Sequence, residues 1–81
     1  MKIAYSERAG RTLEDLTPEL CKSFYKQVKL LAENLRHPSL RAKKYDESRD
    51  IWQARVNRTW RFYFLIRDDV CYIIDIVPHP K

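Results

Sequence analysis

The chain has only one glycine, Gly10, among its 81 residues. Loops that hold nucleotide phosphates need several glycines at fixed spacing, so the Walker and dinucleotide-binding types are both excluded. The two cysteines, Cys21 and Cys71, form no C-x-x-C pair of the kind found in zinc and redox sites. We therefore expect no nucleotide or other small-molecule cofactor and no metal, and we interpret both cysteines as reduced packing residues.

Long hydrophobic runs are also absent. No segment approaches the roughly 18 apolar residues of a membrane-spanning helix, and residues 1–16 contain no apolar stretch of the length found in secretory signals. We therefore expect a cytoplasmic protein that does not bind membranes. Internal repeats and low-complexity segments are missing as well.

What the chain does contain is typical of one small globular domain, which we expect to span residues 1–81. Hydrophobic residues make up 44% and aromatic residues 12%, which is enough for a packed core. The 16 basic and 11 acidic residues give a net charge of +5. This charge favours an anionic partner, such as nucleic acid or an acidic protein, over a basic surface without a function.

The first half of the sequence predicts a strand and two helices. Residues 2–6 form a short apolar strand pattern, and Ser6 can cap a helix over residues 7–16. Thr17 and Pro18 start a second helix that runs to about Arg36, directly after the first, so we expect a helical hairpin. This second helix carries an apolar stripe made of Leu20, Phe24, Val28, Leu31 and Leu35.

The second half predicts a loop and three strands. Residues 39–50 are polar and indicate a loop with little regular structure, anchored by Leu40 and Tyr45. Strand patterns follow at 51–56, 60–66 and 71–77, separated by short turns. The order β-α-α-β-β-β predicts an α+β fold, in which the helices pack on one face of a three-stranded antiparallel meander.

Successive side chains of a strand point to opposite faces of the sheet, so the residues from Ile51 to Ile66 divide into two sets. The core face carries Trp52, Ala54, Val56, Trp60, Phe62, Phe64 and Ile66. The opposite face carries Arg55, Arg61 and Tyr63, where a solvent face more often carries Thr, Lys and Glu. On the last strand, Tyr72, Ile74 and Ile76 alternate with Cys71, Ile73, Asp75 and Val77, so both faces are largely apolar and we expect a central strand. Asp75 has the parity of Arg61 on what we expect to be the neighbouring strand, so a structural pair between these two residues is the alternative to a functional Arg61.

Three stretches resemble the RelE/ParE superfamily of bacterial type II toxins, namely LRHPSLRAKKY, ARVNRTWRFYF and DIVPHPK, in this order after a helical pair. The resemblance covers essentially the whole chain, and the HigB and RelE branches are the most similar. It implies a toxin held inactive by an antitoxin encoded beside it. The RelE and HigB branches cleave mRNA in the ribosomal A site without a metal, whereas the ParE branch poisons DNA gyrase with the same fold, and a fold alone does not choose between them.

The resemblance also implies catalytic residues. Metal-independent RNA cleavage needs cations for the phosphorane and groups that transfer protons. Arg61 stands at the arginine of the family's Tyr-Arg or Trp-Arg pair, and Arg55 matches a basic residue in the preceding strand. His79 follows the last strand like the terminal histidine of HigB and YoeB, which makes it the proton-transfer candidate. Tyr63, on the face of Arg61, can stack on a base or donate a hydrogen bond to phosphate.

Four more basic residues are candidates for RNA binding: Lys43, Lys44, Arg58 and Lys81. Each can contact a phosphate of the ribosome or the message, although each alone also fits a solvated charge. Gln53 departs from the family pattern, because RelE relatives often carry a lysine there.

Three functions therefore remain open for this sequence. The first is a ribosome-dependent mRNA endonuclease that binds mRNA, the ribosome and an antitoxin. The second is a gyrase inhibitor of the ParE kind, which needs no histidine. The third is a catalytically reduced relative that mainly binds its antitoxin, which Gln53 keeps open.

Overall fold

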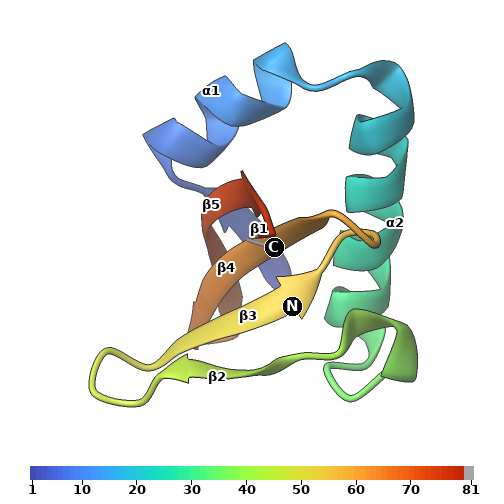
Figure 1. Ribbon diagram of the computed structural model, residues 1–81. Coiled ribbons are helices and arrows are strands. Elements are labelled where there is room, and N and C mark those ends of the chain that lie inside the picture. Colours follow the sequence, from blue (N-terminus) through green and yellow to red (C-terminus); the bar gives the residue numbers. More distant parts are fainter. Residues whose placement is uncertain (80–81) are drawn as a thin grey trace.

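The computed structural model describes residues 1–79 of the chain. In chain order its elements are strand β1 (Lys2–Tyr5), helices α1 (Glu7–Asp15) and α2 (Pro18–Glu33), the 3-10 helix η1 (Pro38–Leu40), and strands β2 (Lys43–Asp46), β3 (Ile51–Arg55), β4 (Trp60–Arg67) and β5 (Val70–Pro78) (Figure 1). A strand, two helices and then the remaining strands follow one another as the sequence predicts. The predicted α+β class is confirmed.

Both helices begin where the sequence places a capping side chain. The hydroxyl of Ser6 accepts a hydrogen bond from the backbone N–H of Ala9 at 3.0 Å, which satisfies an otherwise free donor of α1. The hydroxyl of Thr17 does the same for the N–H of Leu20 at 3.2 Å, and Pro18 occupies the first turn of α2. The two capping predictions are confirmed.

The end of α2 and the angle between the helices differ in detail from the prediction. α2 ends at Glu33 because Asn34 leaves the helical backbone conformation and its side-chain oxygen accepts a hydrogen bond from the N–H of Arg36 at 3.0 Å. Figure 1 shows α1 and α2 meeting at a wide angle instead of lying side by side.

No helix within residues 1–79 is both long and apolar enough to cross a membrane.

All five strands form one sheet in the order β1-β5-β4-β3-β2. Its centre is the predicted antiparallel meander of β3, β4 and β5. β1 adds to this meander in parallel with β5, with Lys2 opposite Val70. β5 is therefore an interior strand, as its two largely apolar faces predict.

The expectation of a loop over residues 39–50 is wrong, because this segment contains the end of η1 and all of β2. β2 pairs antiparallel with β3, so that Lys43 lies opposite Gln53. It is an edge strand, and polar edge strands with lysines lack the apolar alternation by which a strand is recognised. Leu40, one of the two predicted anchors, is fully buried.

A bulge interrupts β5 and changes which residues share a face. Tyr63 lies opposite Asp75 and Phe64 lies opposite Ile73, so Ile74 has no partner on β4. Regular alternation was the wrong expectation for this strand, because Ile73 before the bulge and Ile76 after it both enter the core.

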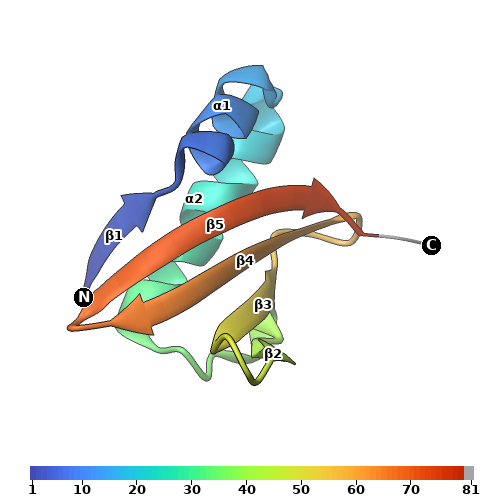
Figure 2. The same cartoon turned by 90° about the vertical axis from the view of Figure 1, so that its left-hand side faces the viewer.

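The core lies between the sheet and α2, which crosses one face of the sheet (Figure 2). Phe24 of α2 meets Phe62 of β4 edge to face, with ring centroids 5.4 Å apart. Phe24 and Phe62 are fully buried, as is Phe64, while Trp52 and Trp60 are partly buried against them. The predicted core face of the strand pair is confirmed.

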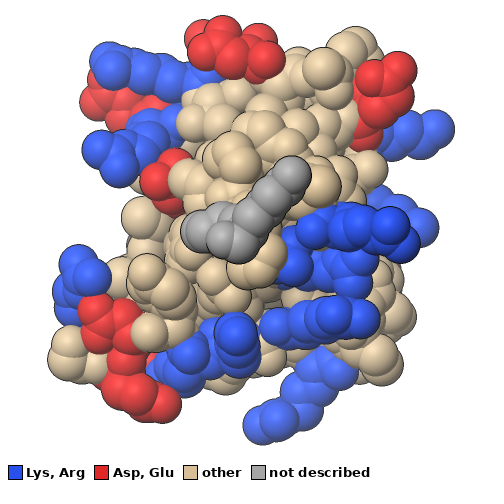
Figure 3. All heavy atoms as spheres, in the orientation of Figure 1, with Lys and Arg blue, Asp and Glu red and all other residues tan. Residues whose placement is uncertain are grey.

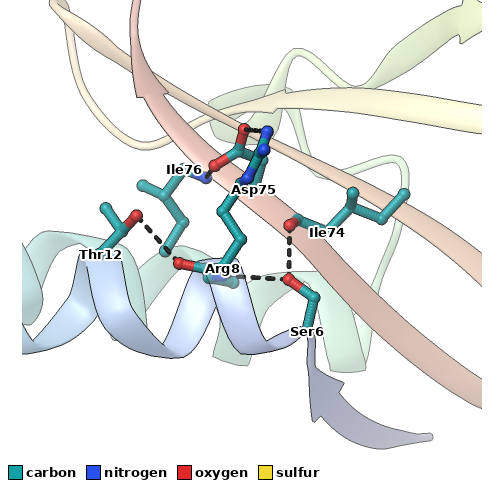
Figure 4. Close-up of polar contacts among 7 residues, drawn as sticks. Ser6, Arg8, Thr12, Ile74, Asp75 and Ile76 are labelled. Atoms are coloured by element: carbon teal, nitrogen blue, oxygen red, sulfur yellow. Dashed lines mark hydrogen bonds and ion pairs between the residues drawn. The ribbon is translucent and has the colours of Figure 1, made fainter.

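α1 is attached to β5 at the bulge (Figure 4). The hydroxyl of Ser6 donates a hydrogen bond to the backbone oxygen of Ile74 at 2.6 Å. The carboxylate of Asp75 lies 3.6 Å from the guanidinium of Arg8 and accepts a hydrogen bond from the N–H of Ile76 at 2.9 Å. The alternative of a structural pair between Arg61 and Asp75 is therefore wrong, because Arg8 of α1 is the partner of this carboxylate.

Candidate functional site

The sheet face away from α2 carries the predicted catalytic side chains of β3 and β4. Arg55 lies directly opposite Arg61, and Gln53 lies directly opposite Tyr63. Opposed residues in an antiparallel pair share a face and have close Cβ atoms. The structure therefore brings Arg55, Arg61 and Tyr63 together, as the sequence predicts.

Arg61 is held in one orientation by the turn between β3 and β4. Its Nη1 donates hydrogen bonds to the backbone oxygens of Asn57 at 2.7 Å and Trp60 at 2.9 Å. A guanidinium has five N–H donors, so the remaining donors of Arg61 stay available for a phosphate. The turn itself is fixed by the Asn57 side chain, whose oxygen accepts a hydrogen bond from the N–H of Thr59 at 2.9 Å.

Three arginines, Arg41, Arg55 and Arg61, form what we call the arginine cluster. Burial lowers the pKa of Arg61, and the charges of Arg55 and Arg41 lower it further, so these guanidiniums lie close enough to repel one another. Arginine remains protonated at such sites. Within residues 1–79, none of the three forms an ion pair with a carboxylate. The cluster is therefore suited to a bound anion.

The basic side chains are gathered on one part of the surface. Figure 3 shows Lys and Arg side by side around the β3–β4 turn and the chain that precedes β2, while Asp and Glu lie mainly elsewhere on this view. Sequence reasoning missed Arg41, which follows η1 in a left-handed conformation with φ of 47°. Only the return of this segment to the sheet brings Arg41 near Arg61, so no local sequence signal could have found it.

A groove of about 520 Å³ lies next to the arginine cluster, between α2, η1 and the β3–β4 turn. It is lined by Ser23, Lys26, Gln27, Pro38, Ser39, Arg41, Arg55, Val56 and Asn57. Gln27 of α2 is only 4% exposed and joins this helix to η1 and to the end of β3. Its Nε2 donates hydrogen bonds to the backbone oxygens of Arg55 at 2.7 Å and Ser39 at 3.1 Å, and its Oε1 accepts one from the Ser39 hydroxyl at 3.2 Å. Gln27 therefore fixes the end of β3 that carries Arg55.

Replacing Gln27 with leucine should lower the free energy of unfolding by about 1–3 kcal/mol, because two partly buried carbonyl oxygens lose their donors. Chemical denaturation of the purified protein measures this loss. Lys29→Leu is a control at an exposed position of the same helix and should change stability by less than about 0.5 kcal/mol. An equal effect of the two substitutions would contradict the role assigned to Gln27.

Tyr63 is oriented by Gln53, which lies opposite it on β3. The side-chain N–H of Gln53 donates a hydrogen bond to the Tyr63 hydroxyl at 2.9 Å. The hydroxyl proton of Tyr63 is therefore free to be donated to another group. The ring of Tyr45 on β2 meets the ring of Tyr63 edge on, with centroids 4.7 Å apart.

A shallow hollow of about 240 Å³ lies beside these rings, and we call it the tyrosine hollow. Its lining residues are Tyr45, Arg49, Ile51, Tyr63, Ile74 and Asp75. Sequence reasoning placed Tyr45 in a loop and so missed that it belongs to this face. Its exposed aromatic ring next to a catalytic candidate marks the hollow as a place for a flat ligand.

His79 is exposed and follows the last residue of β5. Its backbone N–H donates a hydrogen bond to the oxygen of Thr59 at 2.7 Å, which continues the pairing of β5 along the β3–β4 turn. Val77 lies opposite Arg61, and alternation places His79 on the same face as Val77. The chain therefore brings His79 to the end of the sheet that carries Arg61.

The four predicted RNA-binding residues are not on one face. Lys43 lies opposite Gln53 and shares its face, and Arg58 is exposed in the β3–β4 turn. Lys44 belongs to the other face, where its Nζ pairs with Asp50 and lies 5.1 Å from the centroid of the Trp52 ring. Lys81 lies outside the described residues.

The two cysteines are free thiols. Burial raises the pKa of Cys71 to about 12, which makes this thiol a poor nucleophile. Both residues fit the predicted packing role. Among residues 1–79, no group of three or more His, Cys, Asp or Glu side chains is placed to hold a metal ion.

Solved structures share this architecture over nearly the whole chain. A YoeB/ParE toxin from Agrobacterium tumefaciens has a TM-score of 0.84 at 10% identity, covering 99% of this chain and 100% of that one. The YoeB dimer from Staphylococcus aureus has a TM-score of 0.82 at 15% identity, covering 99% and 98%. The archaeal RelE–RelB complex from Pyrococcus horikoshii gives 0.79 at 17% identity, covering 95% and 92%.

Comparison by sequence gives no relative, since no protein-family model and no curated protein matches the chain. At identities of 10–17% the structural likeness shows the fold. This chain has the fold of the RelE/ParE superfamily of toxins from type II toxin–antitoxin systems.

Proposed function

We propose that this protein is the toxin of a type II toxin–antitoxin system and cleaves mRNA on the ribosome without a metal. The fold is that of RelE and YoeB, and structures of their complexes with RelB and YefM are known. The proposal includes a cognate antitoxin that covers the toxin, the ribosome and mRNA as further partners, and the cytoplasm as the place of action. The net charge of +5 fits a polyanionic partner.

The orientation of Arg61 is the observation that carries the proposal. Its guanidinium is fixed by two turn oxygens and lies beside Arg55, with no carboxylate paired to either within residues 1–79. When the 2′-oxygen attacks the phosphate, negative charge accumulates on the phosphorane oxygens. Fixed cations that already point at this charge lower the barrier without reorganising.

Proton transfer is assigned to the groups nearest this pair. The 2′-hydroxyl gives its proton to solvent water as its oxygen bonds to phosphorus. His79, which lies at the Arg61 end of the sheet, is the group proposed to protonate the 5′-oxygen as the P–O5′ bond breaks. The Tyr63 hydroxyl accepts a hydrogen bond from Gln53, so its proton can be donated to a phosphate oxygen. Gln53 therefore acts here through Tyr63, in place of the lysine that RelE relatives carry.

Replacing His79 with alanine should slow cleavage of translated mRNA by about 100-fold or more, because the leaving oxygen loses its acid. The rate is measured in a reconstituted translation reaction over a range of pH. The matched control is His37→Ala, the other histidine, whose Nδ1 accepts a hydrogen bond from the N–H of Ser39 at 3.1 Å and takes no part in the site. An unchanged rate in the His79 variant would leave only Arg55, Arg61 and Tyr63 as chemical groups.

Controlled expression followed by mapping of mRNA 5′ ends tests the proposed function. Cuts inside translated codons that vanish when the start codon is removed would support ribosome-dependent cleavage. DNA damage with intact messages would instead indicate a gyrase inhibitor, and normal growth with folded protein would indicate a catalytically reduced relative. Either of these results would overturn the proposal.

A further inference from the structure

The tyrosine hollow has the size and lining of a site for one flat ring system. Its volume of about 240 Å³ is below the ~300–1,000 Å³ of sites for drug-sized ligands. Tyr45 is 60% exposed, so its side chain is accessible to a ligand. Ile51 and Ile74 add apolar surface to the same hollow. Aromatic and apolar walls of this kind hold unstacked nucleobases.

One carboxylate lines the same hollow, and it is fixed in place. The Asp75 side chain is 21% exposed, accepts a hydrogen bond from the N–H of Ile76 at 2.9 Å, and lies 3.6 Å from the guanidinium of Arg8 (Figure 4). A carboxylate offers about four acceptor sites and no donor. Asp75 therefore retains acceptor sites after these two contacts.

An acceptor-only group distinguishes between the bases. Guanine presents two adjacent donors on its Watson–Crick edge, N1–H and the N2 amino group, and both match the two oxygens of a carboxylate. Adenine and cytosine place a ring acceptor beside their amino group, and uracil places carbonyl oxygens on both sides of its single N–H. A carboxylate in a base-sized hollow thus favours guanine, by the same logic as bidentate readout of base edges in nucleic-acid grooves.

The hollow also lies close enough to the arginine cluster for one RNA strand to reach both. Asp75 is opposite Tyr63, and Val77 is opposite Arg61, two residues further along β5. Two residues of a strand span roughly 6.5 Å. A phosphate at Arg61 and the base of a neighbouring nucleotide in the hollow can therefore belong to one RNA strand.

We propose that the tyrosine hollow binds a guanine base of the RNA, with Tyr45 and Tyr63 against the ring and Asp75 accepting its two N–H donors. Asp75 is then the residue that sets base preference. This inference deepens the proposed function and depends on it for its biological role, while the binding of the base itself can be measured alone.

The test is titration of the purified protein with GMP, AMP, CMP and UMP, followed by NMR at the amides of Tyr45, Tyr63 and Asp75. GMP should bind about tenfold more tightly than the other three. Asp75→Asn should remove this preference, because the amide offers a donor where guanine needs an acceptor. Asp68→Asn, in the exposed turn before β5, removes the same charge elsewhere and should keep the preference.

Equal binding of the four nucleotides to the unaltered protein, or an undiminished preference for GMP in Asp75→Asn, would overturn the inference. Tyr45→Ala serves as a second variant if Asp75→Asn does not fold, because Tyr45 lies on an edge strand and is mostly exposed. It should weaken binding of all four nucleotides about tenfold, and unchanged binding would again contradict the proposal.

The outcome separates this inference from the proposed function. Selective binding of GMP together with intact mRNA in cells would overturn the nuclease and leave the guanine site. Cleavage in cells without a bias toward guanine, together with equal nucleotide binding, would overturn the guanine site and leave the nuclease.

Discussion

Replacing Arg61 with alanine is expected to abolish toxicity and to slow mRNA cleavage by about 100- to 1,000-fold. The substitution removes the cation that the β3–β4 turn holds in place with two hydrogen bonds. Arg55 remains, but it would then be the only one of the two opposed arginines that stabilises the negative charge of the phosphorane. Growth after induction and the cleavage rate in a reconstituted translation reaction are the two measurements.

The control for this variant is Arg67→Ala, at the exposed far end of the same strand. It removes an equal charge on β4 and should retain toxicity. Arg61→Lys is informative as well, because lysine keeps the charge and loses the planar fork, so most of the activity should remain lost. Binding to the antitoxin should persist in all three variants, and full toxicity of Arg61→Ala would remove the centre of the assigned site.

Replacing Phe24 with alanine is expected to lower the free energy of unfolding by about 3–5 kcal/mol. Phe24 is fully buried and contacts the rings of Phe62 at 5.4 Å, Tyr25 at 5.4 Å and Tyr5 at 6.3 Å between centroids. A protein of 81 residues is stable by only about 4–12 kcal/mol in total. The variant should therefore be largely unfolded or close to it at 37 °C.

The matched control is Tyr25→Ala, the next residue on the same helix, which is 50% exposed. It should cost no more than about 1 kcal/mol. Urea denaturation followed by tryptophan fluorescence compares the two variants directly. A loss below about 1 kcal/mol for Phe24→Ala would show that α2 is not the main cover of the sheet.

The sequence predicts those parts of the fold that are determined by residues close to one another in the chain. The caps at Ser6 and Thr17 and the stripe around Phe24 place the helices, and alternation from Ile51 to Ile66 assigns both faces of the strand pair correctly. These features depend on residues close in sequence. The class, the element order and the core face of β3 and β4 follow from them.

Features that depend on distant partners could not be predicted in the same way. β2 is a strand because β3 offers it a free edge, and its own residues are those of a polar loop. The bulge at Ile74 arises where β5 meets both β4 and the start of α1. Arg41 and Asp75 enter the candidate site only through these contacts, whereas Arg55, Arg61 and Tyr63 were accessible from strand parity alone.

The pairing of β1 with β5 has a consequence for the synthesis of the protein. Ser6 and its partner Ile74 are 68 residues apart. At the usual ~5–20 residues per second, a ribosome needs on the order of 3–14 s to make the chain between them. During that interval β1 has no β5 to pair with, so the first edge of the sheet is completed only after the last strand has been made, and this parallel pairing is a non-local, intrinsically slow step of folding.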